Sequence, residues 1–416
     1  MADLKVSIDY FNDEHQKLFE AYPNAADIEA LVINGANISK EEFLGYMMFK
    51  DQLDRVGHKT YNELSARIQH RLGDIDDYLT FGNGSVQAQI IGGDLHQTGL
   101  TERVGIALGL CVVNQIHGLT QADWEKIPEA PGRGGHPTFD FEIPVASTGS
   151  NFIQAENKGS AVQDNSDQRG TVDSHYKGIL RKKKYLRGEE AKLNIPLHDN
   201  LYYGTIGVLD NQTNSTAKVW LVDPPAFNIE MGPRKYKLVS RLTYYLEEFK
   251  EIGLKTKILE ALENRIKEII ASKDYSSFDN KSLDDNYPAQ GTYYLYMEGN
   301  NSLALVDTNE AFGRVFLIER KQRTVPYLIA FPKALMRIII KQNFEQILNY
   351  KYDPDFMREN VQVLMRFTKG DMLERNISEV LKFTFNEKKR SSEAVYFGKL
   401  NFSSDGKIFG MLDNER

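Results

Sequence analysis

Two segments near the middle of the chain alternate between hydrophobic and polar residues. Residues 139–143 place Asp140 on one face and phenylalanine and isoleucine side chains on the other, and residues 152–158 place Glu156 and Lys158 on one face. Side chains two positions apart in a strand share a face, so each segment predicts a short strand. Proline, glycine and serine lie between them, which predicts a hairpin that brings Asp140 beside Glu156 and Lys158.

The pattern around these strands predicts further regular elements. Residues 99–110 are largely apolar and predict a buried helix, and a short strand is expected near Trp124. A helix is predicted over residues 168–187, followed by strands at residues 201–209 and 217–222. Up to residue 209 the predicted order is therefore helix, strand, strand, strand, helix, strand.

The rest of the chain predicts a mixed α+β protein in three parts. These are a helical N-terminal region at residues 1–90, a core at 91–224 and an α+β C-terminal domain at 225–416. In the first part, helices are expected at residues 14–22, 26–32 and 40–78, the last with a capping box of Ser39 and Glu42. In the third part, helices are expected at residues 255–271, 334–350 and 357–367, and strands at 292–297, 303–306, 314–318, 325–331, 397–402 and 408–412, the last two forming a hairpin.

The grouping of two carboxylates with one ammonium predicts a divalent-metal site. Mg²⁺ is usually held by one or two carboxylates together with phosphate oxygens, so Asp140 and Glu156 are the expected ligands. Lys158 is positioned to orient an attacking water or to offset developing charge.

An acid on one strand, followed on the next by Glu156-Asn157-Lys158 with fifteen residues between Asp140 and Glu156, resembles the motif of the PD-(D/E)XK nucleases. The resemblance implies a restriction-endonuclease-like αβββαβ core, with Asp140, Glu156 and Lys158 as catalytic residues. It also implies a catalytic role for Glu102 in the first turn of the preceding helix, although the helix dipole alone favours an acid there. The implied metal is Mg²⁺, with Mn²⁺ able to substitute, and the pattern leaves open whether Glu142 or Glu102 joins it.

Similar acid and lysine patterns at Glu248 to Lys250 and Glu319 to Lys321 lack these surroundings. The first falls in a helical pattern, and the second ends an apolar run. The surroundings of Glu156 therefore distinguish it from both.

The predicted helix after Lys158 carries a dense cluster of basic residues within an acidic chain. Phosphate contacts dominate nucleic-acid affinity and need only a local basic patch, so this helix is a candidate DNA contact, with a solvated lysine-rich face as the alternative. The residues assigned to nucleic-acid binding are Lys177, Arg181, Lys182, Lys183, Lys184 and Arg187.

Composition adds little to this interpretation. The formal net charge is −7, the sequence contains no run of eighteen apolar residues, and the start of the chain does not resemble a signal peptide, so a cytoplasmic protein without membrane contact is expected. The single cysteine, Cys111, excludes an intrachain disulfide and is expected to be a buried apolar residue.

The sequence therefore predicts a metal-dependent DNA endonuclease. The resemblance further implies prokaryotic restriction or anti-phage defence, and with it a binding partner from the same defence system. The alternatives are a catalytically inactive nucleic-acid-binding or scaffold protein of the same fold, and an RNA nuclease or nickase. One site per chain cuts one phosphodiester, so a homodimer is expected if both strands of a duplex are cut together.

Overall fold

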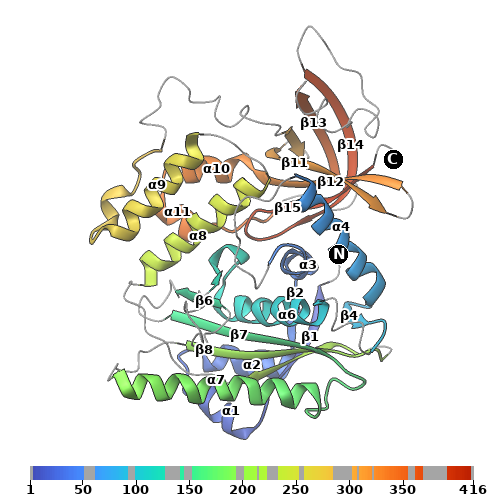
Figure 1. Cartoon of the computed structure of the whole chain (residues 1–416), viewed down its shortest axis with the longest axis vertical. Coiled ribbons are helices and arrows are strands. Elements are labelled where there is room, and N and C mark those ends of the chain that lie inside the picture. Colours follow the sequence, from blue (N-terminus) through green and yellow to red (C-terminus); the bar gives the residue numbers. More distant parts are fainter. Residues whose placement is uncertain are drawn as a thin grey trace. The chain divides into compact units, whose positions relative to one another are not determined.

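The computed structural model describes residues 3–50, 61–91, 99–126, 141–144, 152–193, 201–212, 215–222, 233–252, 257–283, 302–306, 309–320, 323–354, 361–368 and 391–413. The chain is a mixed α and β protein with two compact units (Figure 1). Unit 1 comprises Met1–Arg55 and Arg71–Lys237, and unit 2 comprises Val56–His70 and Leu238–Arg416. Each unit is therefore assembled from two separate stretches of the chain.

Unit 1 is built on a mixed sheet that has seven strands in the described residues. Its order is β2-β1-β9-β8-β7-β6-β5. The strands are β1 (Leu4–Tyr10), β2 (Ala36–Ile38), β5 (Glu125–Lys126), β6 (Phe141–Pro144), β7 (Phe152–Ala161), β8 (Leu201–Leu209) and β9 (Ala217–Val222). Strands β5, β6 and β7 pair antiparallel, β7 and β8 pair parallel, and β8 and β9 pair antiparallel.

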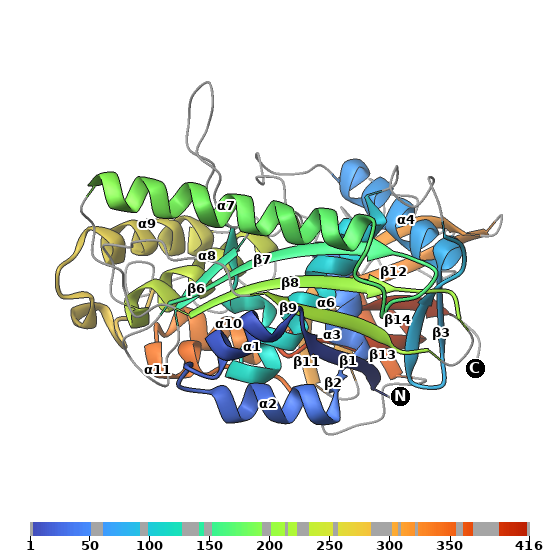
Figure 2. The ribbon, with the colours of Figure 1, turned by 90° about the horizontal axis from the view of Figure 1, so that it is seen from below.

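Helices α6 (Leu100–His117) and α7 (Thr171–Leu193) cover opposite faces of the centre of this sheet (Figures 1 and 2). Strand β7 is buried on both faces, because its odd-numbered side chains face α6 and its even-numbered side chains face α7. On the α6 side, Asn157 accepts a hydrogen bond from Thr205 of β8. On the α7 side, Ser160 donates one to Thr171. The crossover from β7 through α7 to β8 gives the parallel pair.

Glycine residues allow α6 to lie directly on β7. A Cβ atom built on Gly159 would lie 1.7 Å from the carbonyl oxygen of Thr101, and one on Gly105 would lie 2.3 Å from the carbonyl carbon of Lys158. One on Gly109 would lie 2.2 Å from Oδ1 of Asn157. Backbone therefore contacts backbone where α6 crosses β7, and this contact fixes the strand at Lys158.

The first ninety residues differ from the mainly helical region that was expected. Their helices are α1 (Asp13–Phe19), α2 (Ala25–Asn34), α3 (Lys40–Phe49) and α4 (Tyr61–Tyr78). Ser39 caps α3, since its side chain accepts from the backbone N–H of Glu42, which is one of the two hydrogen bonds of the predicted capping box. However, β1 and β2 join the large sheet, and β3 (Leu79–Gly82) and β4 (Ser85–Ala88) form a separate hairpin. Strand β1 runs parallel to β9, and Ser7 Oγ donates to the carbonyl oxygen of Ala217.

Unit 2 contains a closed barrel of six described strands in the order β10-β11-β12-β15-β14-β13. These strands are β10 (Ser302–Val306), β11 (Asn309–Arg320), β12 (Arg323–Pro332), β13 (Val361–Thr368), β14 (Ser391–Phe402) and β15 (Ile408–Asp413). Its helices include α8 (Pro233–Glu251), whose first residues belong to unit 1, α9 (Lys257–Ala271), α10 (Lys333–Ile340) and α11 (Phe344–Leu348).

Several predicted elements of unit 2 are confirmed and others differ. The hairpin of β14 and β15 and the amphipathic helix α9 are confirmed. The helix expected at residues 334–350 is divided into α10 and α11, and Gln342 between them has a positive φ of 53°. The helix expected at residues 357–367 is wrong over its described part, because β13 pairs with β10 and β14 there. The strand expected at 292–297 lies outside the described residues.

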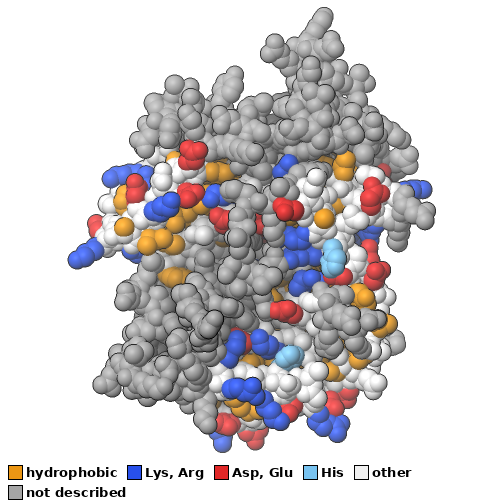
Figure 3. Space-filling view, in the orientation of Figure 1, with side chains coloured by type: hydrophobic (Ala, Val, Ile, Leu, Met, Phe, Trp, Pro, Cys, Tyr) orange, Lys and Arg blue, Asp and Glu red, His pale blue; other side chains and the backbone are white. Residues whose placement is uncertain are grey.

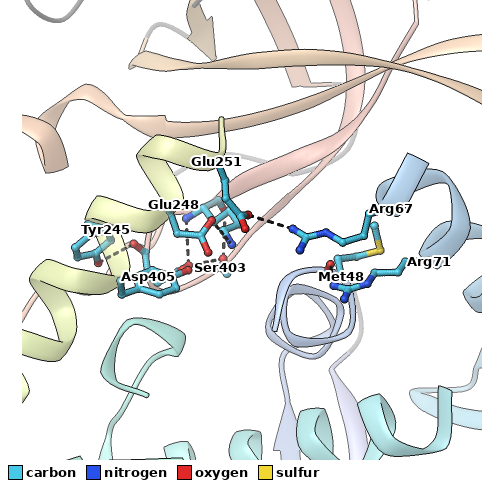
Figure 4. A network of polar contacts seen from close by, with 10 residues as sticks. Met48, Arg67, Arg71, Tyr245, Glu248, Glu251, Ser403 and Asp405 are labelled. Atoms are coloured by element: carbon cyan, nitrogen blue, oxygen red, sulfur yellow. Dashed lines mark hydrogen bonds and ion pairs between the residues drawn. The ribbon is translucent and has the colours of Figure 1, made fainter. Parts of the chain in front are cut away.

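The turn between β14 and β15 is held against α8 by buried polar groups. Lys407 Nζ lies 2.8 Å from Glu248 Oε2, and both side chains are almost fully buried. Asp405 accepts from the side chains of Ser403 and Tyr244, and its carbonyl oxygen accepts from Tyr245 (Figure 4). Burial raises the pKa of Tyr244 well above its ordinary value. The network stabilises unit 2 and includes Glu248, the acid of the acid and lysine pattern that ends at Lys250.

None of the described helices combines the length and the apolar character that a membrane crossing requires.

Candidate functional site

The pairing of β6 with β7 places Glu156 close to the strand on which the second acid was predicted. Phe141 lies opposite Ala155, and Glu142 lies opposite Gln154, so the predicted antiparallel pair is confirmed. Asp140 directly precedes Phe141 in the chain but lies outside the described residues. The side chain of Glu142 is likewise outside the description. The described part of the site therefore begins with Glu156 and Lys158.

Glu156 is a fully buried carboxylate held by two lysines. The Nζ atom of Lys158 lies 2.7 Å from Glu156 Oε1, and the Nζ atom of Lys182 lies 2.6 Å from the same oxygen. Both lysine side chains are 26% exposed, whereas the Glu156 side chain is 0% exposed. The cluster therefore consists of one buried carboxylate and two lysine ammonium groups that reach solvent.

The second carboxylate oxygen of Glu156 has a different environment. Oε2 is buried and has no hydrogen-bond partner among the described residues. A buried carboxylate oxygen without a partner is costly, and such an exception calls for an explanation such as an ion or a water. Oε2 is therefore a described atom suited to bind a cation.

Lys182 reaches Glu156 because it lies on the sheet-facing side of α7. Val172 and Ile179 are buried on that side, and His175 lies within hydrogen-bond distance of the carbonyl oxygen of Gly159, 3.1 Å from its Nε2. Helical neighbours three and four positions apart share a face, so Lys182 continues the row of Val172, His175 and Ile179. Its ammonium thus reaches the polar face of β7.

The other basic residues of α7 are placed differently. Lys177 is exposed and pairs with Asp173, and Arg181 is also exposed. Lys183, Lys184 and Arg187 belong to the helix, but their side chains lie outside the description. Figure 3 shows Lys and Arg side chains and a histidine on the lower part of the face drawn, over the area of β7 and α7 in Figure 1.

Glu102 is not brought to this cluster. It lies in the first turn of α6, as predicted, and its side chain is exposed. Helix α6 covers the face of β7 opposite to Glu156, and no contact within the described residues joins the two acids. The described geometry accounts for Glu102 by its favourable position at the helix N-terminus.

A second polar cluster lies on the α6 side of the sheet. His117 Nε2 is 2.8 Å from the hydroxyl of Tyr203, which also accepts from Asn24 Nδ2 at 3.1 Å. Burial lowers the pKa of His117 to about 4 and raises the pKa of Tyr203. Both groups are therefore neutral near pH 7. Cys111 on α6 is buried as predicted, and burial raises the pKa of its thiol.

The described residues do not form a complete metal site. No group of three or more acidic, histidine or cysteine side chains suitable for a metal occurs among them. Glu156 nevertheless fits a hard cation, because it presents a buried carboxylate oxygen without a described partner. Completion of such a site requires a further oxygen ligand, and the sequence assigns that role to Asp140.

The run of basic residues in α7 predicts nucleic-acid binding for Lys182 and does not indicate that it lies beside Glu156. The signal was its spacing of three, seven and ten positions from Ile179, His175 and Val172, which marks the inward face of the helix. Comparisons of the chain with protein-family models, with curated proteins and with solved structures each found no match. The geometry around Glu156 is therefore the basis for a functional proposal.

Proposed function

We propose that this protein is a metal-dependent DNA endonuclease of the PD-(D/E)XK type. The observation that carries the proposal is the buried carboxylate of Glu156, which pairs with Lys158 through Oε1 and keeps Oε2 without a described partner. A carboxylate that can hold a cation, beside an ammonium that reaches solvent, supports metal-assisted phosphodiester hydrolysis.

The order and pairing of the elements around Glu156 support a restriction-endonuclease-like core. Helix α6 is followed by the antiparallel strands β5, β6 and β7, and then by α7 and the parallel strand β8. This is the αβββαβ order that the motif implies. Since one fold can carry many functions, the side chains on β7 support the activity more strongly than the topology does.

In the proposed reaction, the oxygen of a water forms a bond to phosphorus, and the bond from phosphorus to one sugar oxygen breaks. The attacking water gives up a proton to solvent and the leaving oxygen takes one from solvent, so the products are one phosphate end and one hydroxyl end. Lys158 donates a hydrogen bond that orients the water, because its ammonium is held at the solvent side of Glu156. The backbone contact of Gly105 with Lys158 keeps the strand in place during this step.

Glu156 and Asp140 are the proposed metal-binding residues. Mg²⁺, for which Mn²⁺ can substitute, would supply neutralisation of the charge that develops on the phosphate oxygens. Glu156 contributes its buried carboxylate, and Asp140 directly precedes the strand whose Phe141 lies opposite Ala155. Glu102 is proposed as an accessory acid of the reaction, although no described contact joins it to Glu156.

The basic residues of α7 are proposed to contact the DNA backbone. Lys177 and Arg181 are exposed on the helix that covers Glu156, which supports a phosphate contact near the site. Lys183, Lys184 and Arg187 follow on the same helix. These contacts carry no sequence information, so the recognised sequence stays open.

The proposed setting is prokaryotic restriction or anti-phage defence in the cytoplasm, where a partner protein can act with the nuclease. We also propose a homodimer, because two copies would place two sites on a two-fold symmetric duplex. Light scattering that shows a dimer, together with direct conversion of supercoiled plasmid to linear DNA, would support it. A monomer whose reaction stops at nicked plasmid would contradict it and favour a nickase.

The activity is tested by incubating the purified chain with plasmid, linear duplex, single-stranded DNA and RNA, each with Mg²⁺, Mn²⁺ or EDTA. We expect DNA to be cut with either metal and to stay intact in EDTA. Cleavage of RNA alone would replace the DNA assignment with an RNA nuclease. Binding of nucleic acid without any cleavage would favour the inactive binding or scaffold protein.

A further inference from the structure

We propose that Lys182 makes metal binding at Glu156 depend on nucleic acid. Its ammonium forms an ion pair with Glu156 in the free protein, and this lowers the affinity of Glu156 for a divalent cation. It moves to a phosphate group when nucleic acid binds, and this raises the affinity for the metal. The inference rests on the proposed function, because it assumes that Glu156 is a metal-binding residue.

The first support is the crowding of positive charge on one carboxylate oxygen. Lys158 and Lys182 come from a strand and a helix, and both ammonium groups lie within 2.7 Å of Glu156 Oε1. A cation bound at Oε2 of the same carboxylate would lie a few ångströms from both. Charges at such separations interact strongly even in a partly solvated site, so each lysine disfavours the metal.

The second support is that the two lysines come from different elements of the fold. Lys158 is two residues from Glu156 on the same strand, and the backbone contacts of Gly159 and Gly105 with α6 fix that strand. Lys182 reaches the carboxylate from α7, on a flexible side chain that is 26% exposed. Lys182 therefore belongs to the helix that carries the other basic residues, whereas Lys158 belongs to the strand that carries Glu156.

The third support is the exposed arginine next to Lys182. Arg181 directly precedes it on the same helix. A phosphate group at this helix would give the Lys182 ammonium an alternative anionic partner. Because linkage is reciprocal, nucleic acid that draws Lys182 from Glu156 tightens metal binding, and the metal tightens nucleic-acid binding to the same degree.

The inference is tested by measuring the Mn²⁺ affinity of the full chain without nucleic acid, by electron paramagnetic resonance titration. The proteins compared are the wild type, Lys182→Gln, Lys182→Arg and Lys17→Gln. Lys17 is an exposed lysine of α1 in the same unit and controls for the loss of one positive charge. We expect Lys182→Gln to bind Mn²⁺ about tenfold more tightly, within the usual range of coupling between sites.

The two other variants are expected to stay close to the wild type. Lys182→Arg keeps the charge at Glu156, and Lys17→Gln removes a distant charge, so both should bind Mn²⁺ within about twofold of the wild type. The affinity for a fluorescent DNA duplex in EDTA is measured in parallel. It should fall in Lys182→Gln, because a phosphate contact is lost, and circular dichroism checks that each variant is folded.

Unchanged or weaker Mn²⁺ binding in folded Lys182→Gln would overturn the inference. A gain in Mn²⁺ affinity in Lys17→Gln as large as that in Lys182→Gln would also overturn it. If plasmid is cut with Mg²⁺ while all four proteins bind Mn²⁺ equally, the proposed nuclease stands and the role of Lys182 falls. If plasmid stays intact while only Lys182→Gln gains Mn²⁺ affinity, the role of Lys182 stands and the proposed cleavage falls.

Discussion

The Nζ atom of Lys182 lies 2.6 Å from Oε1 of Glu156, although the two residues are 26 positions apart and belong to a helix and a strand. This contact joins the basic helix α7 to the acid and lysine motif on β7. It means that residues predicted for two separate roles, DNA contact and catalysis, lie in one cluster.

Replacement of Glu156 by Gln is expected to abolish metal-dependent cleavage while the protein stays folded. Removal of a group that merely supports a metal ligand costs roughly 10–100-fold in affinity or activity, so loss of the ligand itself should cost at least about 100-fold. The measurement is the rate of plasmid cleavage with Mg²⁺. Glu319→Gln is the control, because Glu319 is an exposed acid on β11 that begins a similar acid and lysine pattern. Equal loss in both variants would reject the assignment of the site.

Replacement of Lys177 and Arg181 by Ala is expected to weaken DNA binding uniformly across sequences. Each lost phosphate contact should reduce the slope of log affinity against log salt by roughly one unit. The measurement is duplex affinity in EDTA at several salt concentrations.

Lys267→Ala is a close control for Lys177. Lys267 is 68% exposed in an i,i+4 pair with Glu263, and Lys177 is 66% exposed in an i,i+4 pair with Asp173. An unchanged slope in the Lys177 and Arg181 variant would assign this face of α7 to solvent.

Gly159→Ala is expected to destabilise unit 1. The added methyl group would overlap the carbonyl oxygen of Thr101, so α6 or β7 has to move. Overpacking of this kind typically costs about 1–3 kcal/mol and occasionally more. Gly178→Ala is the control, because nothing lies within 4 Å of the new Cβ on α7. That change should stabilise the helix by about 0.5–1 kcal/mol. Urea unfolding measures both, and equal effects would contradict the close contact.

His117 is expected to make unit 1 less stable in acid. Burial lowers its pKa to about 4 in the folded protein, from an ordinary value of 6.5. The unfolded chain therefore takes up a proton first, and stability is lost as the pH falls from about 6.5 to about 4. The loss from this group is about 3 kcal/mol at most. The measurement is the free energy of unfolding against pH for the wild type and His117→Gln. Curves that stay parallel across this window would contradict the shift.

Lys407→Met is expected to destabilise unit 2 by about 3–5 kcal/mol, because it leaves the buried Glu248 carboxylate without its ion-pair partner. The double variant Lys407→Met, Glu248→Leu should recover most of this loss, since apolar pairs often replace buried ion pairs without cost. Thermal unfolding measures both, with exposed Lys399→Met as the control. A double variant no more stable than the single one would show that the pair itself is required.

Much of unit 1 could be predicted from local patterns. Strands β8 and β9 and the buried helix α6 follow from runs of apolar residues, and the pairing of β6 with β7 follows from their alternation and the short connection. Strand β1 also alternates, with Leu4, Val6 and Ile8 buried, but its partner β9 is distant in the sequence. Nothing local indicates that partner.

The parts that could not be predicted depend on contacts over long distances in the chain. Val361 and Val363 are buried in the barrel, and pairing with β10 and β14 makes β13 a strand where local composition favoured a helix. The sequence pattern groups Lys182 with its basic neighbours as a candidate nucleic-acid contact, with a solvated face as the alternative. Only the spacing of Lys182 from the apolar residues of α7 distinguishes it from its exposed neighbours. Its partner, Glu156, comes from β7, which lies far from it in the sequence.

The parallel pairing of β1 with β9 also governs when unit 1 can form during protein synthesis. Ser7 and Ala217, which share a hydrogen bond, are 210 positions apart. At roughly 5–20 residues per second, the ribosome needs on the order of 10–40 s to make the intervening chain. During that interval the hydrogen-bonding edge of β1 that pairs with β9 has no partner, so the nascent N-terminal segment is exposed to chaperones and to misfolding. Slower translation between these strands would lengthen that exposure and lower the yield of folded protein.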